Sequence, residues 1–309
     1  APAAGSGDGA VALLLRRSCS WLVVTVAVLR CGRPFVWLSA GEAQAAGPRD
    51  RNASMLRMAI PCCVVVDDGV QADCVDLAPC VVAAGDLLAS GPRALRPAGD
   101  LLASGPWRPE HRSRPAIGPH SVLGYMYTGG STGSPKCVLA THGMAIHEIL
   151  RYPTVATLSA KDRVLQHTSV LWAASAWGQI DIALAFGATL CISGSRAPSA
   201  NELREAGITT LGAAPVLLAA LSPDELPQLR CIFSWGEALP PAVAALWRAA
   251  GVRLVELLIS TEYWLSFFCD EAPRAGEIAA FNVVAGIDFA VLPQTAGGAT
   301  EGVPVRALD

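Results

Sequence analysis

The stretch MYTGGSTGSPKCVLATHG, residues 126–143, places four glycines, several hydroxyl side chains and one lysine in a chain that is otherwise poor in charge. Glycines let the backbone turn sharply and bring its N–H groups near a ligand, Ser131 and Thr132 add hydroxyl donors, and Lys136 adds a positive charge. The apolar run SVLGYMY before it predicts a strand, and MAIHEILRY after it predicts the start of a helix. The loop is therefore expected where proteins commonly hold an anion, and its donors suit a phosphate.

The sequence of this loop disfavours three other interpretations. A Walker-type P-loop requires Gly-Lys-Ser/Thr, whereas Pro135 precedes Lys136 and Cys137 follows it. A dinucleotide-binding turn requires G-x-G-x-x-G, which GGSTG does not supply. A flexible turn is opposed by the density of hydroxyl groups and by Pro135, which stiffens the backbone.

The composition is that of a globular protein with a large core. Of its 309 residues, 52% are hydrophobic and 16% are charged, which excludes an intrinsically disordered chain. The formal charge of −3 and the lack of long Lys/Arg blocks favour neither nucleic acid nor an anionic membrane as a partner. The run SWLVVTVAVL is about half the ~20 residues that a membrane span needs, so we expect a buried helix and no membrane span there.

Ten cysteines are scattered along the chain without a CxxC pair or a zinc-ligand spacing. This pattern favours a reduced, cytoplasmic protein over a disulfide-bonded one. The chain begins without Met at APAAGSGDG and shows no signal peptide, so we expect an incomplete N-terminus.

Short apolar runs alternate with longer helical segments, which is typical of an α/β fold. Strands are expected in RPFVWL, CCVVVDD, ATLCIS, GITTLGAA, LRCIFSW and VRLVELLI. The segment PPAVAALWRAAG predicts a helix, because Pro240 and Pro241 suit its first turn and Gly251 its end.

A Pro/Gly/Arg-rich segment interrupts this alternation at 84–119. It contains AGDLLASGP twice, at 84–92 and 98–106. Two copies do not make a solenoid, so we interpret the segment as a duplication that lengthens a surface loop.

The motif YTGGSTGSPKCVLATH resembles the phosphate-loop signature Y-T-S-G-S-T-G-x-P-K-G-V of the adenylate-forming enzymes, which include acyl-CoA synthetases and the adenylation domains of nonribosomal peptide synthetases. Gly129 replaces the usual Ser, and Cys137 replaces the usual Gly. The segments LRCIFSWGEALP and VELLISTEYW resemble the family's G-E-A and N-x-Y-G-x-T-E motifs, and order and spacing agree over most of the chain. The resemblance implies a layered α/β large domain, with sheets sandwiched by helices.

In such enzymes a substrate carboxylate attacks the α-phosphate of ATP, giving an acyl-adenylate and pyrophosphate. Both reactants are anions, so catalysis depends on positioning and on neutralising charge. The resemblance implies Lys136, Thr261 and Glu262 as catalytic residues, with Thr261 at the α-phosphate and Glu262 holding Mg²⁺. It implies that the nucleotide is bound by Thr128, Gly130, Ser131, Thr132, Gly133, Lys136, Gly236, Glu237, Ala238 and Leu258.

The adenine-binding motif departs from the family. The usual stacking aromatic falls on Leu258, the adjoining Gly on Ile259 and the Asn on Glu256, so we expect weaker ATP binding. Losing an aromatic platform costs on the order of 1–3 kcal/mol at other base-stacking sites. Trp235 is a candidate replacement, and a core role for Trp235 is the alternative.

The acyl-binding segment is LWAASAW. Amino-acid-activating members place an aspartate where this chain has Ala173, to pair with the substrate ammonium group. Without that partner a buried ammonium is costly to desolvate. The other positions implied to line the acyl pocket are Ala174, Trp177, Phe233, Trp235 and Leu257. All are apolar, which favours an aryl, fatty or keto acid, and a decayed site is the alternative.

The sequence ends before the family's ribose-binding aspartate, its hinge and the small C-terminal domain with the catalytic lysine. We therefore interpret residues 1–309 as an incomplete N-terminal large domain that is weak or inactive alone. The resemblance implies activation of an apolar carboxylic acid with Mg-ATP in the full-length parent, with coenzyme A or a carrier-protein phosphopantetheine thiol as acceptor. The rival hypotheses are a catalytically silent nucleotide-binding remnant and a scaffold that kept the fold.

Overall fold

The computed structural model describes residues 9–40, 48–67, 80–90, 116–128, 136–271, 280–291 and 303–305. The chain forms two compact units, each of which is described by itself. The first comprises Ala1–His147, Leu165–Asp181 and Leu190–Pro198, and the second comprises Glu148–Val164, Ile182–Thr189 and Ser199–Asp309.

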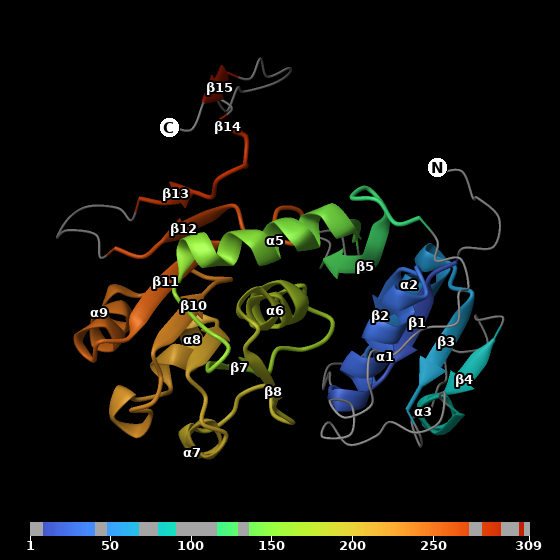
Figure 1. The fold of residues 1–309 in the computed structure, drawn as a ribbon, viewed down its shortest axis with the longest axis horizontal. Helices are drawn as coiled ribbons and strands as arrows, with labels where there is room; N and C mark the ends of the chain where they lie inside the picture. Colours follow the sequence, from blue (N-terminus) through green and yellow to red (C-terminus); the bar gives the residue numbers. More distant parts are fainter. Residues whose placement is uncertain are drawn as a thin grey trace, which may run out of the picture. The chain divides into compact units, whose positions relative to one another are not determined.

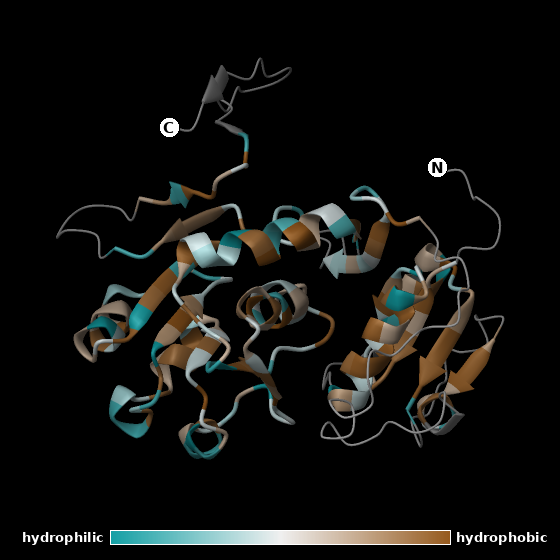
Figure 2. Ribbon diagram, viewed as in Figure 1, coloured by the Kyte–Doolittle hydropathy of each residue, from teal (hydrophilic) through white to brown (hydrophobic). Residues whose placement is uncertain are grey.

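A six-stranded sheet organises the first unit (Figure 1). Its strands, in spatial order, are β4 (Val81–Ala83), β3 (Cys63–Val66), β1 (Val11–Leu14), β2 (Phe35–Trp37), β5 (Val122–Thr128) and β6 (Lys136–Thr141). The neighbouring strands β4 and β3, β3 and β1, β1 and β2, and β2 and β5 pair in parallel. Strand β6 runs antiparallel to β5. All four residues of β1 are buried, as expected for an interior parallel strand. Figure 2 shows β3 and β4 as strongly hydrophobic.

A seven-stranded sheet contributes most of its strands to the second unit. In spatial order they are β13 (Asn282–Val283), β12 (Phe267–Cys269), β11 (Arg253–Leu258), β10 (Cys231–Ser234), β9 (Thr210–Ala213), β7 (Arg163–Gln166) and β8 (Thr189–Ile192). Strands β9, β10 and β11 are parallel, whereas β12 and β13 continue the sheet antiparallel. A separate two-stranded sheet pairs β14 (Phe289–Val291) with β15 (Val303–Val305).

Helices lie between these strands in the sequence. The α-helices are α1 (Cys19–Arg30), α2 (Pro48–Ala59), α3 (Ala84–Ser90), α5 (His142–Val155), α6 (Asp181–Phe186), α7 (Ala200–Glu205), α8 (Pro215–Ala219) and α9 (Pro241–Ala249). A π-helix spans Ala176–Ile180 and a 3₁₀ turn spans Pro223–Glu225. The helix expected from PPAVAALWRAAG is confirmed as α9, which packs beside β11 (Figure 1), and Gly251 follows it with φ +78°.

The core of the first unit forms between helices and sheet. Helix α1 contacts β1 and β2, and its buried face includes Trp21, whose ring lies 4.9 Å from that of Trp37. The ring of Phe35 stacks on Trp37 at 4.5 Å. The helix expected at SWLVVTVAVL is therefore confirmed, although Val26, on another face, is 46% exposed. No helix in the described ranges is long and apolar enough to span a membrane.

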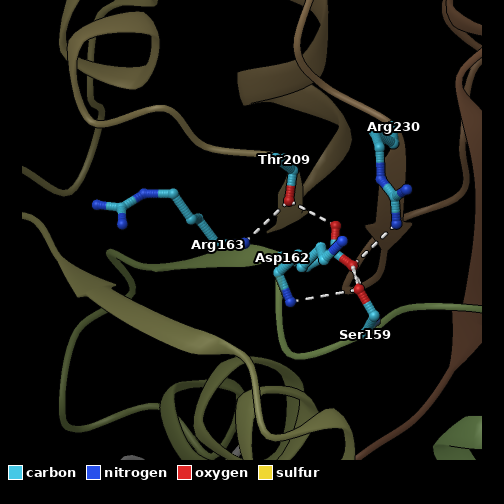
Figure 3. Close-up of polar contacts among 6 residues, drawn as sticks. Ser159, Asp162, Arg163, Thr209 and Arg230 are labelled. Atoms are coloured by element: carbon cyan, nitrogen blue, oxygen red, sulfur yellow. Dashed lines mark hydrogen bonds and ion pairs between the residues drawn. The ribbon is translucent and has the colours of Figure 1, made fainter.

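The second unit contains a buried carboxylate that links, through hydrogen bonds, the residues just before three strands (Figure 3). Asp162, just before β7, is 2% exposed. It accepts hydrogen bonds from Ser159 N–H at 2.8 Å and Ser159 Oγ at 3.1 Å. It also accepts from Thr209 Oγ1, just before β9, at 2.8 Å and from Arg230 Nη2, just before β10, at 2.8 Å. Thr209 Oγ1 in turn accepts from Arg163 N–H at 2.9 Å. This network is structural, since every bond joins parts of the scaffold.

The segment expected to be a surface insertion is only partly described. Residues 84–90 of the first AGDLLASGP copy form α3 directly after β4, so this part is helical. The second copy, at 98–106, lies outside the described residues. The interpretation of 84–119 as one insertion stays a prediction.

Candidate functional site

The phosphate-type loop connects two antiparallel strands. Thr128 is the last residue of β5, Lys136 is the first of β6, and the two are directly paired in the ladder. Lys136 is exposed and Thr128 is half-buried. Two of the predicted phosphate ligands are therefore neighbours at the two ends of the loop. The other four, Gly130, Ser131, Thr132 and Gly133, lie outside the described residues.

The helix expected at MAIHEILRY is confirmed as α5 (His142–Val155), but a strand that was not predicted, β6, separates it from the loop. In the first turn of α5, Thr141 Oγ1 accepts from Met144 N–H at 3.3 Å. Five steps of about 3.4 Å place Thr141 about 17 Å along the strand from Lys136. The partial charge of a helix terminus acts within one turn, so an anion in the loop depends on loop amides, hydroxyls and Lys136.

A cavity of about 300 Å³ opens in the second unit where β10 and β11 end. In open α/β sheets, ligands commonly bind at the carboxyl ends of parallel strands. The lining residues are Gly236, Glu237, Ala238, Glu256, Leu257, Leu258, Ile259 and Phe281. The structure thus brings together five residues predicted from the G-E-A and T-E motifs, namely Gly236, Glu237, Ala238, Leu257 and Leu258.

Backbone geometry and a hydrogen bond shape the wall after β10. Gly236 has φ +88°, a left-handed conformation that favours glycine. Three residues later, Leu239 N–H donates to Glu256 Oε1 at 3.1 Å. The departure at Glu256 therefore has a structural use, because its carboxylate holds the 236–239 segment against β11.

Two residues that line the cavity, Leu258 and Phe281, show which side chains are available where the family has an adenine-stacking aromatic. Leu258 is 46% exposed, so the expected stacking position presents an aliphatic side chain. Trp235 is 3% exposed and is not among the lining residues, which supports its core role. Phe281 lines the cavity instead and was missed, since it lies 17 residues beyond the end of the VELLISTEYW motif and belongs to no recognisable pattern.

The predicted catalytic pair Thr261 and Glu262 lies in a compact turn after β11. Ser260 Oγ donates to Glu262 Oε2 at 2.7 Å, and Ser260 N–H donates to the Tyr263 carbonyl at 2.9 Å. Trp264 Nε1 donates to the Thr261 carbonyl at 2.9 Å, and the Trp264 ring is buried. The turn is thus anchored by Trp264, while the Glu262 side chain remains exposed. The described ranges contain no group of three or more His, Cys, Asp or Glu residues able to hold a metal.

The predicted acyl-binding residues are divided between the units. Ala173 and Ala174 in the first unit are half-buried and lead into the π-helix, which contains buried Trp177. The Ala173 carbonyl accepts from the Ala176 and Trp177 N–H groups, both at 2.9 Å. π-helical turns are rare and frequent at functional sites.

The second-unit members share a sheet face in part. Phe233 pairs in register with Val255, and Leu257 lies two residues further along β11, so Phe233 and Leu257 project to the same face. Phe233 is fully buried against the edge of Tyr152, with ring centroids 5.6 Å apart. The role of all six acyl-site residues stays a prediction.

Two buried polar side chains near the Ala173 segment were missed. Gln179 Oε1 accepts from the N–H groups of His167 and Thr168 at 3.2 and 3.3 Å and from Thr168 Oγ1 at 2.9 Å. Arg17 Nε donates to the Ser193 carbonyl at 2.8 Å, and Nη1 donates to the carbonyls of Thr168, at 2.9 Å, and His167. Together they fix the loop after β7. The only feature of the sequence that could have indicated Gln179 and Arg17 is that each is a polar residue next to an apolar run.

The comparison with known families decides the assignment. The sequence model of the family described as "AMP-binding enzyme" matches residues 3–301. The chain belongs to this family. The AMP-binding domain is therefore of the adenylate-forming type predicted from the loop, and its fold is the predicted mixed α/β large domain.

Two nonribosomal peptide or toxin synthetases are similar in sequence to this chain. "HC-toxin synthetase" of Cochliobolus carbonum is 29% identical over 263 residues, which cover 78% of this chain and 5% of that protein. "Nonribosomal peptide synthetase 32" of Fusarium pseudograminearum is 35% identical over 135 residues, covering 43% of this chain and 2% of that protein. The chain thus spans a small part of both relatives.

A solved structure supports the same fold. The "Klebsiella oxytoca NpsA N-terminal subdomain in complex with 3-hydroxybenzoyl-AMSN" superposes with a TM-score of 0.73 at 20% identity, covering 94% of this chain and 72% of that one.

Proposed function

We propose that this domain binds Mg-ATP and that, within the full-length parent protein, it activates a carboxylic acid as an acyl-adenylate. A carboxylate oxygen forms a bond to the α-phosphorus, and the bond from that phosphorus to the β,γ-pyrophosphate breaks, releasing pyrophosphate. The observation that carries the proposal is the pairing of Thr128 with Lys136 at the two ends of the glycine-rich loop, in a chain of the AMP-binding family.

Each predicted phosphate contact has a chemical reason. The Lys136 ammonium neutralises phosphate charge, and Thr128 adds a hydroxyl beside it. We assign Gly130, Ser131, Thr132 and Gly133 to the β- and γ-phosphates on the strength of the motif, and Thr261 to the α-phosphate.

Glu262 is suited to hold the magnesium ion. Mg²⁺ prefers oxygen ligands, keeps several waters and is usually bound by one or two carboxylates together with substrate phosphates. A single exposed carboxylate beside the pocket-forming strand β11 fits that requirement. The ion supplies charge neutralisation on the phosphates, and the turn held by Ser260 and Trp264 keeps Glu262 in position.

We assign the substrate to acids that lack an α-ammonium group. Ala173 offers a methyl group where a carboxylate partner for an ammonium is needed, and a buried unpaired cation is costly. Ala174, Trp177, Phe233, Trp235 and Leu257 favour an apolar acyl group. The aryl ligand named for the NpsA subdomain is compatible with this class, although at 20% identity that structure speaks for the fold alone.

The acyl acceptor is proposed to be a thiol. Relatives named as nonribosomal peptide synthetases favour a carrier-protein phosphopantetheine, with coenzyme A as the alternative.

Calorimetry with Mg-ATP tests nucleotide binding. We expect Lys136→Ala to weaken the affinity at least tenfold, because a charge-assisted contact contributes about 1.5–3 kcal/mol. Lys161→Ala is the matched control, since Lys161 is an exposed lysine that does not belong to the loop. Absence of Mg-ATP binding by the wild type, or equal losses in the two variants, would overturn the proposal.

Pyrophosphate release by the full-length parent protein tests the acid class, because residues 1–309 are expected to be weak or inactive alone. Phenylpropionate and phenylalanine share the ring and the chain length, so their ratio of kcat/KM isolates the ammonium group. We expect phenylpropionate to be preferred. Preference for phenylalanine would refute the assignment of Ala173. Mg-ATP binding without pyrophosphate release from any acid would instead favour a silent nucleotide-binding domain, the alternative suggested by Leu258 and Ile259.

A further inference from the structure

We propose that Phe281 provides the aromatic face on which the nucleobase stacks, in place of the residue at Leu258. The inference rests on the proposed binding of Mg-ATP and adds a base-recognition residue from a different strand. Phe281 lies directly before β13 and lines the cavity at the ends of β10 and β11.

Exposure and position favour Phe281 over the other candidates. It is the one aromatic among the eight lining residues, and it is half-buried, whereas Trp235 is enclosed in the core. Leu258 adds an exposed apolar surface to the same cavity. An aromatic ring and an aliphatic side chain together suit a flat apolar ring face.

The strand ladder holds Phe281 near the pocket. Asn282, its neighbour, pairs with Phe268 of β12, and Phe268 pairs with Leu257 of β11. The backbone of Val284 donates to the Ser266 carbonyl at 2.9 Å, which continues the antiparallel contact. Phe281 is therefore positioned by two consecutive strand pairings, β13 with β12 and β12 with β11, that lead to the end of β11 lining the cavity.

The charge of the cavity favours a base and disfavours a phosphate there. Its lining includes the carboxylates of Glu237 and Glu256 and, among the residues that the structure describes, no cation. Like charges repel, so an anionic phosphate is unsuited to this cavity. A carboxylate accepts hydrogen bonds, so the rim suits a neutral heterocycle with amino donors. The Glu256 carboxylate is fixed for this purpose by Leu239 N–H at 3.1 Å.

The test separates base stacking from phosphate binding with two probes, Mg-ATP and the base-free Mg-tripolyphosphate. We expect Phe281→Leu to weaken Mg-ATP binding fivefold or more, a change of about 1 kcal/mol, because an aliphatic side chain cannot stack. Its affinity for Mg-tripolyphosphate is expected to stay within twofold of wild type. Phe281→Tyr keeps the ring and is expected to keep the Mg-ATP affinity.

Phe267→Leu is the matched control, because Phe267 belongs to the same hairpin but does not line the cavity. It is expected to leave both affinities unchanged. Wild-type binding of Mg-ATP with equal affinities for Phe281→Leu and wild type would overturn the stacking role alone. A parallel loss for both probes would also overturn it, since the effect would not concern the base. Failure of the wild type to bind Mg-ATP would overturn the proposed function itself.

Discussion

The Asp162 network predicts a large loss of stability on Asp162→Ala. The substitution removes the acceptor for Ser159 N–H and for the Thr209 hydroxyl, both bonded at 2.8 Å. Hydrogen bonds to charged groups contribute about 1.5–3 kcal/mol each, and the lower value applies here because Ser159 is exposed and regains water. The Arg230 side chain is 55% exposed, so its ion pair adds at most about 1 kcal/mol. We expect the free energy of unfolding to fall by about 3 kcal/mol.

Chemical denaturation measures this change, and Asp270→Ala is its matched control. Asp270 also pairs with an arginine, Arg253, at 2.9 Å, but it is 28% exposed and its partner 45%. An exposed pair contributes about 0–1 kcal/mol, so the control loses less than the Asp162 variant. Equal losses would refute the argument that burial decides the strength of the network. The Mg-ATP affinity of folded Asp162→Ala is expected to be unchanged, because the network joins strand starts and the cavity lies where β10 and β11 end.

Three further variants or reactions test other parts of the structure. Gly124→Ala is expected to lower the free energy of unfolding by about 1–3 kcal/mol in denaturation experiments, because the added Cβ would lie 2.9 Å from the buried ring of Phe35. Gly194→Ala is the control and is expected to be neutral, because its added Cβ meets no atom within 4 Å. Ala173→Asp is expected to raise kcat/KM for phenylalanine relative to phenylpropionate in pyrophosphate release, and a variant that only loses stability would show that 173 does not face the substrate. Burial raises the pKa of the Cys231 thiol to about 12. We therefore expect mass spectrometry at pH 8 to show that Cys231 is alkylated far more slowly than the exposed cysteines. Equal alkylation rates in the native protein would contradict the burial of Cys231.

Local patterns predicted the strands and helices that have clear boundaries. The apolar runs around Phe233 and Leu257 became the adjacent parallel strands β10 and β11, and the proline pair at 240–241 marked the start of α9. The two motifs that follow these strands met in one cavity because parallel neighbours end at the same sheet edge.

Features that depend on long-range pairing escaped prediction. KCVLAT was treated as part of the phosphate-type loop, since a short apolar run does not by itself identify a strand. It is a strand because β5 supplies its hydrogen-bond partners. Phe281 reaches the cavity only through the β11–β12–β13 ladder, and nothing in the residues around it encodes that placement.

The direct pairing of Thr128 with Lys136 also bears on how the protein assembles as it folds. That contact encloses the seven residues 129–135, whereas the pairing of Val36 with Tyr125 in the same sheet joins segments more than eighty residues apart. Loop-closure entropy makes the longer contact about 2 kcal/mol more costly, and hairpins form in about 1–10 µs. We therefore expect Thr128 and Lys136, at the two ends of the phosphate loop, to pair early in folding, before the parallel sheet is complete. As a result, changes in the length of the chain before β5 are expected to leave the closure of this loop unchanged.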